Sequence, residues 1–301
     1  MKNIKKWPYI FITPYFLIYF SFGLFPVLFS LYISFTDWDG IGKMKFVGFG
    51  NYLKLFSTDP YFLKSILNTL ILMIGYLPVL LIGGLLLAVA LFNKKIKGRQ
   101  YYQLANFLPY ITTPVAIGII FLLLFDWQTG TVNKLLVHSG LVSEGVNWLG
   151  NVWTARLVVV LMATWKYMGY CMVFYLAGLT NISVDIYEAA FVDGSGPVNT
   201  FFKITLPLLR PIIVFLLITS IIGGFQLMEE PMLLMGSTGF GGYAGGPERS
   251  CLTAVWNLYD TAFGSTMRYG FAAAISYGLF IFISLFSIVG MKITNRGGNI
   301  V

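Results

Sequence analysis

Ionisable side chains are scarce in the apolar parts of this sequence, and one lysine occurs inside such a part. Lys166 lies within the apolar stretch 157–180, ten residues after Arg156, which corresponds to a helical rise of about 15 Å. An unpaired ammonium group at that depth in hydrocarbon costs several kcal/mol, so such a lysine is normally paired or faces water. Two interpretations stay open: Lys166 binds a solute, or it forms a structural ion pair.

Aromatic and polar residues at suitable spacing could complete a binding site around this lysine. Tyr170 and Phe174 share its face of a helix and would offer a hydroxyl group and aromatic rings, which suit a sugar. Residues at the end of a later apolar stretch could pair with Lys166 or contact solute hydroxyls: Gln226, Glu229 and Glu230. Solvated charges at a helix end are the alternative for that later group.

A polar segment, 182–211, predicts two short helices joined by a hinge. Ser183 can cap the first helix, and Gly194 can end it in a left-handed conformation. Pro197 suits the first turn of the second helix. The first helix carries two small residues that let another surface approach closely and two carboxylates that could anchor it: Ala189, Ala190, Glu188 and Asp193. The pattern predicts a docking surface.

The elements that position these residues are membrane-spanning helices. Of the 301 residues, 57% are hydrophobic and 11% charged, and the mean hydropathy is +0.77, whereas soluble domains are about a quarter charged. The apolar runs approach or exceed the roughly 20 residues needed to span a bilayer, and they lack the alternation of a strand barrel. About six helices are predicted, at 9–35, 66–92, 104–125, 155–180, 211–228 and 269–291.

Charge and cysteine usage narrow the function further. The segments that would be cytoplasmic with the N-terminus inside are those before the first helix, between the second and third, between the fourth and fifth, and after the sixth. They hold slightly more Lys and Arg than the other segments, which predicts that both termini lie in the cytoplasm. Membrane topology explains the net charge of +8 better than nucleic acid does. The first apolar run is longer than the roughly 7–15 residues of a secretory signal core. His138 is the only histidine, and nothing clusters with Cys171 or Cys251, so no metal site is expected.

The docking segment resembles the EAA loop of type I importer permeases of the ATP-binding cassette (ABC) transporter superfamily. The pattern of that loop is E-A-A, three residues, G, nine residues, I, one residue and L-P. Every position is matched here, by Glu188, Ala189, Ala190, Gly194, Ile204, Leu206 and Pro207. Further segments resemble carbohydrate-type permeases related to the maltose transporter: 34–40, 46–52, 225–235, 245–247, 259–263 and 268–276. A glycine-rich extension at 236–247 departs from them; it lacks a P-loop ending and is interpreted as an outer turn.

The resemblance implies an all-α integral membrane protein of the MetI-like permease architecture, with a cytosolic EAA coupling helix. It divides the chain into an N-terminal membrane helix with the first outer loop at 1–64, the permease domain at 65–291 with the EAA loop at 183–211, and a cytosolic tail at 292–301. The expected location is the bacterial cytoplasmic membrane.

The resemblance also implies partners and a function. The expected partners are a second permease subunit, two cytosolic ATPase subunits that bind ATP and Mg²⁺, an extracytoplasmic solute-binding protein and the lipid bilayer. The chain itself would hold no cofactor, catalyse nothing and import a sugar, in particular an oligosaccharide. A glycerol phosphate ester or a peptide is the alternative solute. An ion-coupled carrier is a weaker alternative, because it needs no docking loop, and a membrane enzyme would need clustered catalytic groups.

Overall fold

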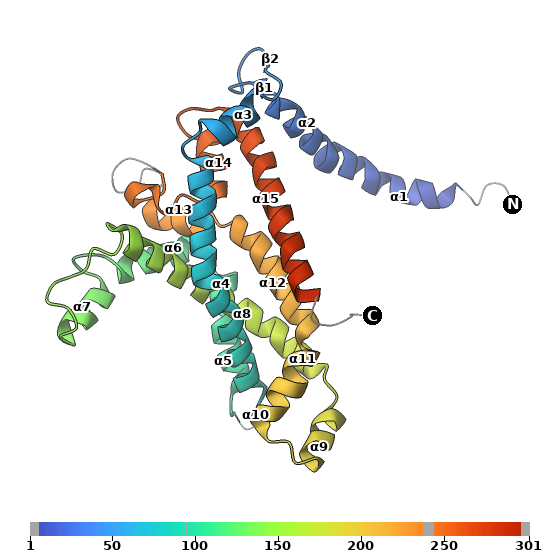
Figure 1. The fold of residues 1–301 in the computed structure, drawn as a ribbon, viewed down its shortest axis with the longest axis vertical. Helices are drawn as coiled ribbons and strands as arrows, with labels where there is room; N and C mark the ends of the chain where they lie inside the picture. The colour runs from blue at the N-terminus through green and yellow to red at the C-terminus, as the bar shows by residue number, and fades with distance from the viewer. Residues whose placement is uncertain (1–5, 94–95, 237–243, 296–301) are drawn as a thin grey trace. The chain divides into compact units, whose positions relative to one another are not determined.

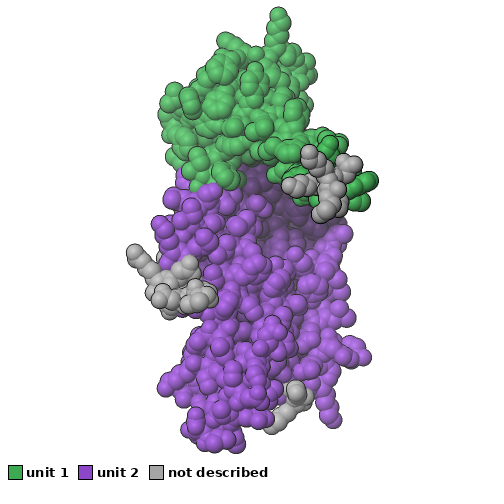
Figure 2. All heavy atoms as spheres, turned by 90° about the vertical axis from the view of Figure 1, so that its right-hand side faces the viewer, with its two compact units in different colours: residues 1–63, 257–281 green, residues 64–256, 282–301 purple. Residues whose placement is uncertain are grey.

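The structure of the chain is a computed structural model (Figure 1), and it describes residues 6–93, 96–236 and 244–295, of which 293–295 are described in backbone only. The chain divides into two compact units, coloured green and purple in Figure 2. One unit contains residues 1–63 and 257–281, and the other contains residues 64–256 and 282–301.

The first unit begins with a long apolar helix that is π-helical in its middle. It consists of α1 (Trp7–Ile18), the π-helical segment η1 (Tyr19–Leu24) and α2 (Phe25–Ser34). Pro26 lies two residues after the end of η1. It has no amide hydrogen, and its ring would clash with the carbonyl one turn earlier, so the helix widens there. Only 6% of the most apolar part of Trp7–Ser34 is buried within this chain.

The rest of the first unit forms around the loop after α2. Strands β1 (Thr36–Asp37) and β2 (Lys45–Phe46) pair antiparallel, and α3 (Gly50–Ser57) follows. Asn51 is buried, and its Nδ2 donates hydrogen bonds to the carbonyls of Ser34 at 2.9 Å and Thr36 at 2.8 Å. These bonds fix the chain where it leaves α2. Parts of α14 (Ala254–Phe263) and α15 (Tyr269–Asn295) complete this unit.

The second unit is built around one long helix, α8 (Val152–Thr180). Helices α5, α6, α12 and α13 contact α8 directly. The elements of this unit are α4 (Phe62–Phe92), α5 (Arg99–Ile111), α6 (Pro114–Leu124), α7 (Thr131–His138), α9 (Val184–Val192), α10 (Pro197–Thr200), η2 (Phe201–Thr205), α11 (Leu206–Leu208), α12 (Arg210–Phe225), α13 (Glu229–Met235) and η3 (Pro247–Arg249).

Glycines allow the neighbours of α8 to approach it closely. A Cβ atom at Gly169 would collide with the backbone carbonyl oxygen of Asn106 on α5. On the α4 side, a Cβ atom at Gly84 would lie 2.8 Å from the Cβ of Cys171. Small residues at such crossings are typical of helix packing in membranes, where close backbone approach replaces the hydrophobic driving force. They let α8 be buried along about half of its most apolar part.

The predicted all-α membrane fold is confirmed, but the predicted single helix 104–125 is wrong. It is two helices, α5 and α6, with a bend of 99° between them. Thr113 adopts an extended conformation (ψ 136°) because it precedes Pro114, and a residue before proline is disfavoured in the helical region. A second bend, of 63°, separates Pro197–Leu208 from α12.

The described residues therefore contain four helices long and apolar enough to span a membrane, or up to six spans if each bent pair counts as one. The last helix, predicted to end at residue 291, continues to Asn295. Cys171 and Cys251 are both free and buried. Most of the glycine-rich turn, residues 237–243, lies outside the described residues.

Candidate functional site

Lys166 forms an ion pair with two glutamates of the short helix α13. Its Nζ lies 2.6 Å from Oε1 of Glu230 and 3.8 Å from Oε2 of Glu229. Lys166 is 5% exposed and Glu230 is 1% exposed, whereas 62% of the Glu229 side chain is exposed. The buried pair ties α13 to the middle of α8. This geometry corresponds to the structural ion pair that the sequence left open.

The same ion pair also fixes the orientation of a neighbouring tyrosine, Tyr167. The hydroxyl group of Tyr167 donates a hydrogen bond to Oε1 of Glu230 at 2.8 Å. The Nζ of Lys166 lies 4.9 Å from the centre of the Tyr167 ring. Tyr167 therefore has a fixed orientation, and its ring forms part of the wall of an adjoining cavity.

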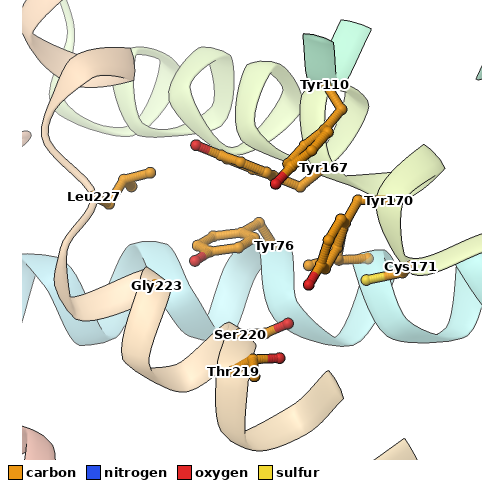
Figure 3. Close-up of a pocket in the computed structure, with 11 residues that line it drawn as sticks. Tyr76, Tyr110, Tyr167, Tyr170, Cys171, Thr219, Ser220, Gly223 and Leu227 are labelled. Carbon is orange, nitrogen blue, oxygen red and sulfur yellow. The ribbon is translucent and has the colours of Figure 1, made fainter. Parts of the chain in front are cut away.

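This cavity has a volume of ≈ 210 Å³ and is lined mainly by tyrosines and small polar residues. Figure 3 shows four tyrosine side chains that come from three helices and converge on one space: Tyr76 of α4, Tyr110 of α5, and Tyr167 and Tyr170 of α8. The Tyr110 and Tyr170 rings lie 4.9 Å apart between centroids. The wall on α12 consists of Thr219, Ser220, Gly223 and Gly224, and Leu80, Cys171 and Leu227 complete the lining.

The residues predicted for a solute path separate into different environments. Tyr170 lines the cavity, and Lys166 acts on it through Tyr167. Phe174 lies one turn further along α8, where its ring contacts Tyr170 and Phe215. Gln226 and Glu229 are exposed beyond the end of α12 and do not line the cavity. Sequence reasoning missed the other cavity residues because they lie on four helices whose pairing no local pattern reveals: Tyr76, Tyr110, Tyr167, Thr219 and Ser220.

The segment with the E-A-A pattern forms the predicted helix, hinge and second helix. Ser183 precedes α9, and its Oγ accepts a hydrogen bond from the amide of Asp185. Gly194 ends the helix with a φ of +74°, which favours glycine because it has no Cβ atom. The chain then turns, with the amide of Ser195 donating to the carbonyl of Ala190 at 2.9 Å, and Pro197 begins α10.

Helix α9 presents most of its surface outward. Phe191 and Val192 are 82% and 83% exposed, and the predicted coupling residues Glu188, Ala189, Asp193 and Gly194 are also exposed. Ala190 differs, since it is only 6% exposed and faces its own chain. Its small size therefore serves packing within the loop. Further along, Ile204 and Leu206 are half-buried in η2 and α11, and Pro207 is exposed.

The loop is continuous with the helix that forms one wall of the cavity. After Gly194 the chain passes through α10, η2 and α11 and enters α12 at Arg210. About three turns later, α12 contributes Thr219 and Ser220 to the cavity. A displacement of the loop can reach the cavity wall through this short run of backbone.

This chain is similar to membrane components of known transport systems. The family model described as binding-protein-dependent transport system inner membrane component matches residues 61–295. Among similar proteins, the lactose transport system permease protein LacF of Rhizobium radiobacter is 34% identical over 95% of this chain and 92% of its own length. The arabinooligosaccharides transport system permease protein AraP of Bacillus subtilis is 35% identical, covering 96% and 89%. The sn-glycerol-3-phosphate transport system permease protein UgpA of Yersinia pestis is 31% identical, covering 96% and 94%.

Two solved structures have the same fold. A bacterial ABC transporter involved in the import of the acidic polysaccharide alginate contains a chain with a TM-score of 0.82 and 24% identity, covering 98% of both chains. A bacterial alginate ABC transporter in complex with an alginate pentasaccharide-bound periplasmic protein gives a TM-score of 0.77 and 25% identity, covering 98% of this chain and 95% of that one. The chain therefore belongs to the family of binding-protein-dependent transport system inner membrane components, the ABC importer permeases that its EAA loop resembles.

Proposed function

We propose that this chain is one permease subunit of an ATP-driven importer that moves an oligosaccharide across the bacterial cytoplasmic membrane. The observation that carries the proposal is the tyrosine-lined cavity, joined to the exposed α9 loop by the consecutive helical segments α10, η2, α11 and α12. LacF and AraP, two similar proteins, are named for the transport of saccharides, which supports the same class of solute.

The lining of the cavity suits a sugar. Phenol rings offer apolar faces on which a pyranose can stack, and their hydroxyl groups exchange hydrogen bonds with sugar hydroxyls. Thr219 and Ser220 add hydroxyl groups on the opposite wall. Because ≈ 210 Å³ is below the roughly 300–1,000 Å³ of ordinary ligand pockets, the cavity would hold one part of an oligosaccharide at a time. A second permease subunit would supply the remaining contacts.

Energy for transport would come from outside this chain. Two cytosolic ATPase subunits would bind ATP and Mg²⁺, and the exposed surface of α9 would seat on one of them. When the ATPase subunits close, α9 would move and α12 would shift the cavity wall, which changes access to the solute. This chain would then act as a mechanical coupler and perform no catalysis.

The remaining partners follow from the same scheme. An extracytoplasmic solute-binding protein would deliver the solute, as in the alginate transporter solved with its periplasmic protein. The exposed apolar side chains of Trp7–Ser34 would face lipid. Both termini would lie in the cytoplasm, so that α9 is on the ATPase side. A glycerol phosphate ester is the second candidate solute, because UgpA is also similar.

The first test removes the stacking surface. We expect Tyr110→Ala and Tyr170→Ala each to lower oligosaccharide uptake by about tenfold or more, because each removes a ring and a hydroxyl group worth about 1–2 kcal/mol in contact with a sugar. Uptake would be measured in cells that carry the complete importer, with a permease deletion as background. Tyr102→Ala is the matched control, since Tyr102 lies on the same helix as Tyr110 but is 57% exposed. Normal uptake in both cavity variants would reject the cavity as the solute site.

The second test acts on the hinge. Gly194→Val places a β-branched side chain at a φ of +74°, which costs at least about 1–2 kcal/mol although open space surrounds the Cβ position. We expect α9 to lose its fixed angle, so that the complex assembles and hydrolyses ATP but uptake per ATP falls severalfold. Gly196→Val is the control, because Gly196 also has open space but an ordinary φ of −72°. Equal coupling ratios in the two variants would contradict a hinge function for Gly194.

A further inference from the structure

The cavity is lined by neutral residues and borders a cluster with a net negative charge. None of its eleven lining residues is lysine, arginine or a carboxylate. The ionised groups that adjoin it through Tyr167 are Lys166, Glu229 and Glu230, with formal charges of +1, −1 and −1, which sum to −1. The positive charge of Lys166 is therefore already neutralised, and a negative charge remains beside the cavity.

Hydrogen-bond polarity gives a second, independent constraint. The proton of the Tyr167 hydroxyl is donated to Glu230, and the same carboxylate oxygen also accepts from Lys166 at 2.6 Å. The Tyr167 oxygen can consequently offer only its lone pairs to a solute. A sugar hydroxyl can donate to that oxygen, whereas a carboxylate or phosphate oxygen has no hydrogen to donate.

On these grounds we infer that the cavity takes uncharged saccharides and excludes those that carry carboxylate or phosphate groups. This inference rests on the proposed function and names the solute class of the same site. An anionic group in the cavity would lie among neutral residues, near a net negative cluster and opposite an acceptor. A charge taken out of water needs an opposite charge beside it, and none of the lining residues carries a positive charge.

The next basic residue along α8 is engaged elsewhere. Arg156 lies ten residues before Lys166, about 15 Å along the helix axis. Its Nη2 donates to Oδ1 of Asn68 at 2.8 Å, its Nε donates to the carbonyl of Ser250 at 3.2 Å, and its guanidinium group stacks on Trp153. It serves to join α8 to neighbouring segments and does not line the cavity.

The names of similar proteins include both uncharged and anionic solutes. LacF and AraP are named for uncharged saccharides, whereas UgpA is named for a phosphate ester and the solved transporters import an acidic polysaccharide. The charge of the solute is thus a separate question from membership of the family.

The inference can be tested first on the complete importer. A strain that carries it and a permease-deletion strain would be given one pool of neutral and uronate oligosaccharides of matched length, together with glycerol 3-phosphate. Mass spectrometry would measure permease-dependent depletion of each compound. We expect depletion only of neutral oligosaccharides. Depletion of uronates or glycerol 3-phosphate at a comparable rate would overturn the inference but leave the importer function, whereas no permease-dependent depletion of any saccharide would reject the proposed function itself.

A second experiment isolates the cavity from the solute-binding protein. The purified permease and ATPase complex in nanodiscs, without the binding protein, would be titrated with the neutral oligosaccharide that is taken up and with a uronate analogue of equal length. Glu229→Lys changes the cluster charge from −1 to +1 at an exposed position and leaves the Lys166–Glu230 pair in place. We expect the ratio of uronate to neutral affinity to rise by at least about tenfold.

Glu144→Lys is the matched control, because it makes the same charge change at an exposed position that does not line the cavity. The ratio of affinities should stay at the wild-type value in that variant. An equal ratio in wild type, Glu229→Lys and Glu144→Lys would show that the cluster does not select the solute, and the inference would fall.

Discussion

Removing the ammonium group of Lys166 is expected to destabilise the folded chain by about 3–5 kcal/mol. In Lys166→Met, the carboxylate of Glu230, which is 1% exposed, keeps only the hydrogen bond from Tyr167. Breaking a buried ion pair from one side is costly because the remaining charge is left uncompensated in a medium that solvates it poorly. The effect would be measured as the unfolding temperature and the denaturation midpoint of the purified protein in detergent.

Replacing Glu230 should destabilise the folded chain less than replacing Lys166. In Glu230→Leu, Lys166 still has Glu229 within 3.8 Å, and that carboxylate can move closer because 62% of its side chain is exposed. The double variant Lys166→Met/Glu230→Leu removes both buried charges, and we expect it to recover most of the stability lost in Lys166→Met. Additive losses in the double variant would mean that the two residues act separately and that the ion pair does not stabilise the structure.

Oligosaccharide binding and uptake by the same three variants separate the effect of the ion pair on folding stability from its effect on the solute site. The double variant should fold, yet Tyr167 loses the acceptor that orients its hydroxyl group. We therefore expect its oligosaccharide affinity to fall severalfold even where its stability is restored. This effect is a consequence of the hydrogen bond between Tyr167 and Glu230, which couples the ion pair to the cavity.

Features that depend on neighbouring residues in the sequence were predictable here. The cap at Ser183, the left-handed Gly194 and the start of α10 at Pro197 all follow from the conformational preferences of single residues, and each is confirmed. The bend between α5 and α6 had a local signal as well, the proline at 114. It was missed because the apolar run of 104–125 had the right length for one span.

Features that depend on distant residues could not be predicted from one sequence. The depth of Lys166 indicated that it needs a partner or water, but Glu230 lies 64 residues away and helix periodicity cannot select it. The cavity is even more difficult to predict, because each of its tyrosines alone fits an ordinary membrane helix. Only the packing of α4, α5, α8 and α12 brings the lining residues together. The sequence also could not show that Ala190 faces its own chain while Ala189 is exposed, since both alanines fit a docking surface.

Replacing Phe191 by aspartate should remove the docking of the ATPase subunits. Phe191 is 82% exposed and lies beside the equally exposed Val192 at the end of α9, so this apolar surface is available to a partner. Large aromatic side chains at the centre of an interface contribute about 2 kcal/mol or more each, and a buried aspartate adds a desolvation cost. We expect the affinity for the ATPase subunits to fall by at least about thirtyfold, measured by co-purification and by titration of the permease in nanodiscs.

Two further variants make the result specific. Phe191→Ala keeps the surface neutral and should weaken docking less than Phe191→Asp, since only the side-chain contact is lost. Leu141→Asp introduces the same charge at a leucine that is 73% exposed in the loop after α7, far along the chain from α9, and should leave docking unchanged. If Phe191→Asp binds the ATPase subunits as tightly as Leu141→Asp does, the exposed end of α9 is not the contact, and energy would have to enter this chain through another surface.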